Sequence, residues 1–240
     1  MPITDTVVHE IAMRWADIDS LNHVNNVVYV DYASEARAVL GEAVADAPVR
    51  SMSVRFLQPL LLSREPVEVA SAVDGATVTQ QIRRRGSDAV FAEIRTELGA
   101  LRPIPPHPAV GKPFAMAVRR SDLDQSGNVS LTKLFELFQE LRILFVSEQV
   151  QQMQAGRFVV GTVAVAQAQP VPWRAEPYAA RARITRVGAG SITIESEILD
   201  EDTVLVRSTS VMVGFDAQHQ QSRRLDDDER AIFEATLDAS

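Results

Sequence analysis

An internal repeat constrains the fold of this chain more than any other feature of the sequence. The segment from Arg14 to Arg37 aligns without a gap with the segment from Arg119 to Arg142, 105 positions further on. Six positions are identical in the two copies: Arg14/Arg119, Asp17/Asp122, Asp19/Asp124, Val24/Val129, Glu35/Glu140 and Arg37/Arg142. A strand pattern precedes each copy and an apolar helix follows it. The repeat therefore predicts two structural units of one kind, and 240 residues are enough for two cores.

Four strand-like segments follow the helix of each copy, separated by turn sequences. They lie at about 51–57, 67–73, 77–84 and 90–98 in the first half, and at about 158–166, 179–187, 191–199 and 203–215 in the second. The helix that begins near residue 131 is apolar on nearly every side, so other structure must surround it. We therefore expect an α+β fold of two tandem hot-dog domains, each a curved antiparallel sheet wrapped around a central helix.

Proline marks the boundary between the halves. Residues 102–113 contain five prolines in twelve positions, which is typical of a stiff, extended linker. We expect an N-terminal domain at 1–101 with the intact copy of the repeat, a C-terminal domain at 114–217 with a degenerate copy, and a helical tail at 218–240. In the tail, Asp226 precedes Glu229 by three residues, which is typical of a capped helix start.

Charge and composition exclude several classes of function. The net charge of −8 gives a field that repels phosphate backbones, so we expect no nucleic-acid partner. The absence of cysteine removes disulfides, thiolate nucleophiles and Cys-ligated zinc. The four histidines show no metal-ligand spacing, and no nucleophile elbow or phosphate-binding loop is present. Without a signal peptide or a run of 18 apolar residues, the sequence predicts a cytoplasmic protein with no membrane partner.

The second copy contains a stretch with some features of a calcium loop. In SDLDQSGNVSLTK, residues 121–133, Asp122, Asp124 and Ser126 occupy positions 1, 3 and 5 of an EF-hand loop. Position 12, where an EF-hand has a bidentate Glu, is Lys133. An ammonium group cannot ligate calcium, and a strand pattern stands where an EF-hand has its first helix. We interpret the stretch as the second copy of a strand-to-helix connection.

The densest group of reactive side chains lies in DIDSLNHVNN, residues 17–26. It contains two carboxylates, one imidazole and three carboxamides directly before a helix. The free N–H groups and positive dipole end of a helix start suit a thioester carbonyl as charge develops on its oxygen. A nearby carboxylate can then activate water or attack directly. Helix capping accounts for one or two such residues. It does not account for all of them: Asp17, Asp19, Asn22, His23, Asn25 and Asn26.

Here the sequence resembles a known family. RWADIDSLNHVNNVVY, residues 14–29, with its second copy RRSDLD, is similar to the motif R-x-S-D-x-D-x-N-x-H-V-N-N-x-x-Y of hot-dog thioesterases. The similarity is to tandem hot-dog acyl-carrier-protein thioesterases and related acyl-CoA thioesterases. It implies that Asp19 and His23 are catalytic and that the helix start around Asn25 and Asn26 supplies the N–H that binds the carbonyl. The asparagine two positions after the aspartate in the family is Leu21 here, so Asn22 or Asn25 is expected to replace it.

The resemblance implies an acyl thioester hydrolase whose acyl chain lies between helix and sheet. Arg83, Arg84 and Arg85 are candidates for binding the phosphates of coenzyme A, although exposed arginines at a strand end also resist aggregation. We expect no metal and no cofactor, because coenzyme A or phosphopantetheine arrives as part of the substrate. The expected partner is a small acyl thioester or an acyl carrier protein, and a homodimer of the tandem unit is a further possibility.

Two alternatives stay open. A hot-dog hydratase or dehydratase also needs an Asp and a His, but its usual pattern spaces them five apart around Asn-Pro, whereas Asp19 and His23 are four apart without proline. A non-catalytic acyl-CoA-binding or regulatory protein is the alternative from a different class, because half of the motif has decayed.

The decay of the second copy predicts one active site per chain. His23 corresponds to Asn128, and the two asparagines that follow it correspond to Ser130 and Leu131. Asp124 is therefore expected to be structural, as a cap of the second helix. The recurrence of Glu and Arg at 35 and 37 and at 140 and 142 suggests a structural pair on each helix.

Overall fold

The computed structural model describes residues 6–19, 22–107, 113–149, 157–216 and 218–238. The chain divides into two compact units, Met1–Leu101 and Arg102–Ser240, called here the N-terminal and C-terminal units. Part of the expected linker, at 108–112, lies outside the described residues. No helix in the described ranges is long and apolar enough to cross a membrane.

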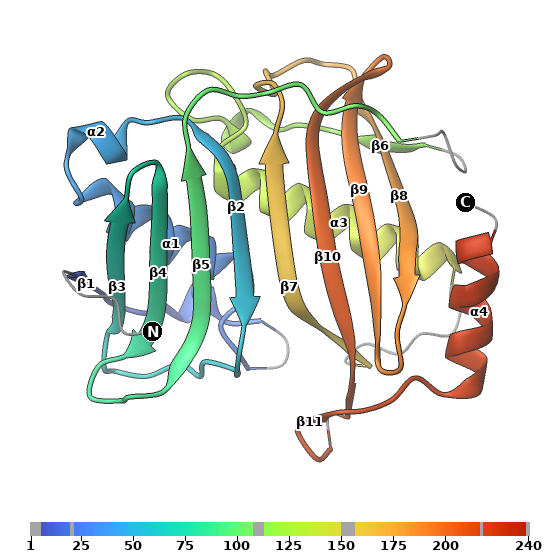
Figure 1. Cartoon of the computed structure of the whole chain (residues 1–240), viewed down its shortest axis with the longest axis horizontal. Coiled ribbons are helices and arrows are strands. Elements are labelled where there is room, and N and C mark those ends of the chain that lie inside the picture. The colour runs from blue at the N-terminus through green and yellow to red at the C-terminus, as the bar shows by residue number, and fades with distance from the viewer. Residues whose placement is uncertain (1–5, 20–21, 108–112, 150–156, 217, 239–240) are drawn as a thin grey trace. The chain divides into compact units, whose positions relative to one another are not determined.

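The N-terminal unit is an antiparallel sheet with one main helix against its inner face (Figure 1). Its elements are β1 (Val7–Ile11), η1 (Trp15–Asp17), α1 (Val28–Ala38), α2 (Glu42–Ala45), β2 (Val49–Phe56), β3 (Val67–Asp74), β4 (Thr77–Arg84) and β5 (Val90–Leu98). The strand order is β1-β3-β4-β5-β2. Alternate residues of β4, Val78, Gln80 and Ile82, are buried, and Gln80 Nε2 donates to the Ala33 carbonyl of α1 at 2.9 Å. This face of the sheet therefore carries the helix.

The C-terminal unit repeats the arrangement. Its elements are β6 (Phe114–Met116), η2 (Arg120–Asp122), α3 (Leu131–Gln149), β7 (Phe158–Gln167), β8 (Tyr178–Val187), β9 (Ser191–Asp200), β10 (Thr203–Asp216), β11 (Gln221–Ser222) and α4 (Asp227–Asp238). The strand order is β7-β10-β9-β8-β6, which matches the first unit strand for strand, with β11 added beside β10. The predicted α+β class of two hot-dog units is confirmed.

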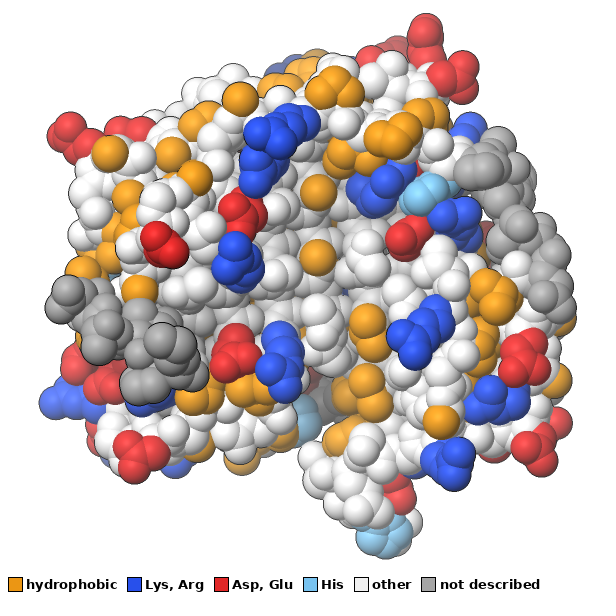
Figure 2. Space-filling view, viewed as in Figure 1, with side chains coloured by type: hydrophobic (Ala, Val, Ile, Leu, Met, Phe, Trp, Pro, Cys, Tyr) orange, Lys and Arg blue, Asp and Glu red, His pale blue; other side chains and the backbone are white. Residues whose placement is uncertain are grey.

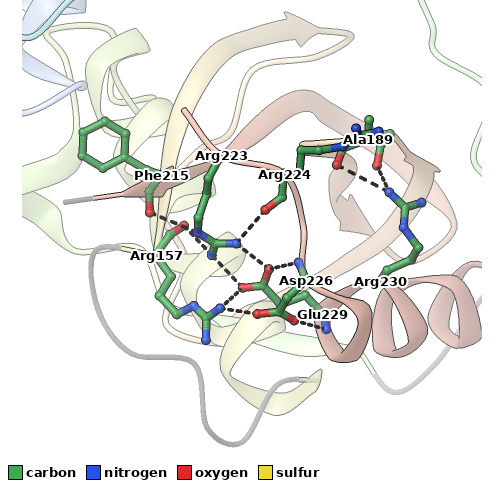
Figure 3. Close-up of polar contacts among 9 residues, drawn as sticks. Arg157, Ala189, Phe215, Arg223, Arg224, Asp226, Glu229 and Arg230 are labelled. Carbon is green, nitrogen blue, oxygen red and sulfur yellow. Dashed lines mark hydrogen bonds and ion pairs between the residues drawn. The ribbon is translucent and has the colours of Figure 1, made fainter. Parts of the chain in front are cut away.

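The tail helix α4 is held by an ion-pair cluster at its start (Figure 3). Asp226 and Glu229 form a reciprocal capping box, with N–H to carboxylate distances of 2.8 and 3.0 Å. Arg223 binds both oxygens of Glu229 at 2.7 Å, and Arg157 Nη2 lies 2.9 Å from the same carboxylate. The buried Phe233 packs edge-on against Phe158, with ring centroids 5.8 Å apart. The tail is therefore an integral part of the C-terminal unit.

The described residues up to His107 pack on the outer face of the sheet of the C-terminal unit. His107 N–H donates to Glu197 Oε1 at 3.3 Å, and Arg207 also donates to Glu197. Arginine can only donate, so His107 Nδ1 accepts from Arg183 Nη2 at 2.8 Å. The other ring nitrogen of His107, Nε2, lies 2.8 Å from Glu195 Oε2. Figure 2 shows a histidine among arginine and acidic side chains over the strands of this unit. The segment is tied to the sheet by charge.

Candidate active site

A tight turn between β1 and α1 holds the candidate catalytic residues. Asp19 N–H donates to the His23 carbonyl at 2.8 Å, and His23 N–H donates to Asp19 Oδ1 at 3.1 Å. Asn22 N–H donates to the Asp19 carbonyl at 3.1 Å with φ of 61°, a left-handed conformation that asparagine tolerates well. Ile18 and Val24 pair as an antiparallel bridge beneath the turn. The Asp19 carboxylate is therefore fixed by the loop that carries it.

The structure brings Asp19 and His23 together through the His23 main chain. Both side chains are partly buried, and in the described part of the chain no hydrogen bond reaches the His23 imidazole. Asn22 is exposed, and its contact with the turn is also through the backbone. Among the described residues, no side chain therefore fixes the orientation of the imidazole by a hydrogen bond.

Asp17 braces the loop. Its Oδ2 accepts from Arg14 N–H at 2.7 Å and from the Tyr32 hydroxyl of α1 at 2.7 Å, while its carbonyl accepts from Asn25 N–H at 2.8 Å. Asp17 of η1 is thereby linked to Asn25, just before α1, and to Tyr32, inside α1. Burial, followed by the hydrogen bond to Asp17 and its charge, raises the pKa of Tyr32 well above its usual value. The phenol therefore stays protonated and donates to the carboxylate.

The helix start differs from the expected one, because α1 begins at Val28 rather than at the asparagines. Asn25 Oδ1 accepts from Val27 N–H at 3.0 Å, and its carbonyl accepts from Val28 N–H at 2.9 Å. Asn25 Oδ1 therefore holds the turn before α1 and is not a free acceptor. Within the described ranges, no acceptor is found for the Asn26 N–H, which directly precedes these two bonded donors.

Tyr29 is a site residue to which sequence analysis assigned no role. It is 3% exposed and packs edge-on against Phe56 with ring centroids 5.2 Å apart. Burial raises the pKa of its hydroxyl, the backbone of Leu60 opposes this, and the negative charge of Asp19 raises it further. Leu60 also accepts from Val24 N–H at 2.8 Å, so the 57–66 loop borders the turn. Two of the chain's three tyrosines, Tyr29 and Tyr32, lie within six residues after Asn26, a signal that could have marked them.

The three candidate phosphate-binding arginines do not form one patch. Arg83 donates to Gln81 Oε1 at 2.8 Å, and Arg85 pairs with Glu10 at 3.3 Å. Arg84 follows the alternation of β4 and therefore points to the inner face, the side that carries α1. The register pairs Arg84 with the first residue of β3, which pairs in turn with the last residue of β1, where the chain enters the site loop.

The second copy repeats the backbone turn of the first. Asp124 N–H donates to the Asn128 carbonyl at 2.8 Å, and Asn128 N–H lies 3.3 Å from Asp124 Oδ1. Gly127, with φ of 79°, takes the place of Asn22. Asp124 Oδ1 also accepts from the Ser126 N–H at 2.8 Å. The expectation that Asp124 caps the second helix was wrong: it holds its own turn, and Ser130 Oγ faces the first-turn N–H of Lys133 at 3.4 Å.

One family model matches part of this chain. Residues 1–95, fewer than half of the chain, match the model described as "Acyl-ACP thioesterase C-terminal domain". Over these residues the chain is similar to the acyl-ACP thioesterase family. The matched part contains the whole of the site loop. No sequence match to a curated protein was found.

Solved structures of acyl-ACP thioesterases and a related enzyme share the fold over most of the chain. A putative oleoyl thioesterase from Lactobacillus plantarum is 16% identical, with a TM-score of 0.61 over 87% of this chain and 95% of that one. The 12:0-ACP thioesterase from Umbellularia californica is 11% identical, with a TM-score of 0.63 over 87% and 94%. An acyl-ACP thioesterase from Bacteroides thetaiotaomicron is 10% identical, with a TM-score of 0.60 over 86% and 97%. At these identities the likeness describes the fold alone.

Proposed function

We propose that the N-terminal unit hydrolyses an acyl thioester at the Asp19–His23 turn. One observation carries the proposal, the placing of a carboxylate and a donor in one turn. The Asp19 carboxylate accepts the His23 N–H at 3.1 Å in the turn that leads into α1. In the same turn the Asn26 N–H has no acceptor in the described ranges. A fixed carboxylate and an unused donor at a helix start are the two parts that acyl transfer needs.

The chemistry follows one of two routes. In the general-base route, Asp19 takes a proton from water, and the hydroxide attacks the carbonyl carbon. The oxyanion then develops beside the Asn26 N–H, at the positive end of α1. Collapse breaks the C–S bond, and the thiolate takes a proton from Asp19 or His23 to leave as a thiol. In the nucleophilic route, Asp19 attacks the carbonyl carbon, the C–S bond breaks, and the thiolate takes a proton from water to leave as a thiol. The hydroxide so formed hydrolyses the mixed anhydride to the free acid and the Asp19 carboxylate.

The thiol-bearing arm is proposed to approach along the inner face of β4. Of the three arginines, Arg84 is the one that the strand alternation directs to this face, at the end of the sheet where the site loop begins. A guanidinium there suits the phosphate of a phosphopantetheine arm, which acyl carrier protein and coenzyme A both contain. The similarity of residues 1–95 to the acyl-ACP thioesterase model favours acyl carrier protein as the carrier.

The test is release of free thiol from acyl-CoA and acyl-ACP panels of two to eighteen carbons and an aryl thioester. Asp19→Asn is expected to keep the fold and to lower kcat by about 10²- to 10⁴-fold, the usual contribution of a positioned acid or base. Asp124→Asn, the same change in the matching turn of the other unit, is the control and should leave kcat within about twofold of wild type.

Arg84→Ala should raise KM for the preferred carrier with little change in kcat, because it removes ground-state binding. Arg85→Ala, which removes an outward arginine paired with Glu10 at 3.3 Å, is its matched control. Full activity of Asp19→Asn, or equal losses in Asp19→Asn and Asp124→Asn, would show that the proposed carboxylate is not the catalytic one. Equal increases in KM for Arg84→Ala and Arg85→Ala would contradict the proposed path of the thiol-bearing arm.

A further inference from the structure

The C-terminal unit contains a buried cation that the proposed reaction does not use. Arg142 lies on α3 and is 5% exposed. Its Nη1 donates to Ser210 Oγ of β10 at 3.2 Å, so the side chain points at the inner face of the sheet. This is the one hydrogen bond found for its five N–H donors, and no carboxylate in the described ranges lies within ion-pair distance of it.

The matching arginine of the N-terminal unit is satisfied differently. Arg37 donates to the carbonyls of Val44 and Ala45 at 2.9 and 2.8 Å, where it closes the end of α2. The expected Glu–Arg pair on each helix is therefore wrong for the described residues. The repeated position carries a backbone-binding arginine in one unit and an isolated buried cation in the other.

Hydroxyl groups line the surface that Arg142 faces. Ser208 and Ser210 stand two residues apart on β10, so their side chains share one face, and Ser196 of β9 lies directly opposite Ser208. All three serines are buried. The Ser208 Oγ is fully buried and has no hydrogen-bond partner in the described part of the chain. Ser210 accepts from Arg142 and keeps its own hydroxyl proton available to donate.

This combination leaves a charge and two hydroxyl donors without a complement in an apolar interior. Burial lowers the pKa of Arg142 to about 10, so the guanidinium remains charged at neutral pH. A buried charge without a counter-ion is strongly unfavourable, as is a buried hydroxyl without a partner. Val163 and Ile194, the strand partners of Ser210, supply no acceptor. A bound anion would satisfy all three groups at once.

We propose that the C-terminal unit binds a carboxylate against Arg142, with the Ser208 and Ser210 hydroxyls as further donors. The planar fork of a guanidinium matches the two oxygens of a carboxylate. A doubly charged phosphate would leave excess charge in this apolar surrounding, so a monoanion is the better fit. Two sources have this chemistry: a fatty acid, the product class of a thioesterase, and a small free carboxylate such as acetate.

The test is titration of the full chain, in carboxylate-free buffer at constant ionic strength, with sodium acetate, sodium decanoate or sodium chloride. The readouts are thermal unfolding and the ¹⁵N-labelled arginine Nε–H spectrum. One arginine signal, absent in Arg142→Met, should shift saturably with a carboxylate. At a hundred times the Kd, the ratio of folded to unfolded chain should rise about 100-fold. Saturation by acetate points to a small anion, and saturation by decanoate alone points to a fatty acid.

Two serine variants keep the test independent of the folding of Arg142→Met. Ser208→Ala preserves the charge and should raise the Kd for the carboxylate by about tenfold, the contribution of one hydrogen bond to a charged group. Ser71→Ala, a buried strand serine in the N-terminal unit that accepts from Gln80 at 3.1 Å, should leave that Kd unchanged. The proposal is overturned if neither carboxylate saturates, if chloride acts equally, or if Ser208→Ala or Arg142→Met binds like wild type.

Asp19→Asn separates this site from the catalytic one. That variant should lose hydrolysis and retain the carboxylate-dependent shift of the arginine signal. Loss of the shift in Asp19→Asn would place the bound carboxylate at the catalytic turn and would also overturn the proposal.

Discussion

Tyr32→Phe is the change that best tests whether the site depends on the hydrogen bond that fixes Asp17. It removes a hydroxyl that donates to Asp17 Oδ2 at 2.7 Å. Loss of a hydrogen bond to a charged group should lower the free energy of unfolding by about 1.5–3 kcal/mol. Asp17 also holds the Asn25 N–H through its carbonyl at 2.8 Å, directly before the proposed carbonyl-binding donor of Asn26. A misplacement of about 1 Å there can cost up to about 10²-fold in rate.

The assay is thioester hydrolysis over a range of substrate concentrations, paired with denaturant unfolding. We expect kcat to fall by about 5- to 100-fold with KM within about twofold, because the proposed path of the acyl chain and thiol arm does not include Asp17. Tyr178→Phe is the matched control: it removes a 2.7 Å hydrogen bond to the Pro172 carbonyl in the other unit and should change stability without changing kcat. If Tyr32→Phe loses stability and keeps wild-type kcat, the brace is structural only and the reasoning fails.

Three further predictions concern the C-terminal unit. Asp124→Ala should lower the free energy of unfolding by only about 0.5–1 kcal/mol, because the exposed side chain holds a turn rather than a helix. Chemical denaturation measures this free energy, and a loss above about 2 kcal/mol contradicts the prediction. Burial, with Arg207 and Arg183, lowers the pKa of His107 despite the charges of two nearby glutamates. Its contribution to stability should therefore be complete above the unfolded pKa of about 6.5 and decline as pH falls below it, and His107→Gln should weaken this decline in pH-dependent unfolding. Millimolar calcium should leave the melting temperature unchanged, because Lys133 occupies the closing ligand position; a rise of several degrees would refute this interpretation.

Sequence patterns predicted most of the fold because they depend on local periodicity. The alternation of buried residues along β4 and β9 and the all-round apolarity of α3 are properties of short windows, and the strand boundaries agree within two or three residues. The repeat added the long-range information, since two copies of one order of elements require two units of one topology. The matching strand orders of the two units bear this out.

The candidate site was predictable in composition and not in detail. Asp19 and His23 were found by their density, but their contact is made by the His23 main chain, and no residue pattern encodes this. The start of α1 was misplaced because Asn25 lies in a turn before the helix, where its side chain and its carbonyl accept the Val27 and Val28 N–H groups. The Tyr32–Asp17 bond joins residues fifteen positions apart, beyond the reach of local propensity. Such contacts depend on how the helix is rotated against the loop, and tertiary packing decides that.

The two turns show which part of the site is scaffold and which part is chemistry. Asp19–His23 and Asp124–Asn128 share the same pair of backbone bonds, at 2.8 and 3.1 Å in each turn, so the turn forms without an imidazole. In both copies the aspartate carboxylate accepts N–H groups of its own turn, so it stabilises the turn whether or not it reacts. What separates the copies is the side chains around the turn, since Leu137 stands where the other helix has Tyr32. The C-terminal unit retained the scaffold and placed a buried cation, Arg142, against the sheet instead. Divergence between the halves therefore changed the ligands that each interior can accept while the backbone that presents them stayed the same.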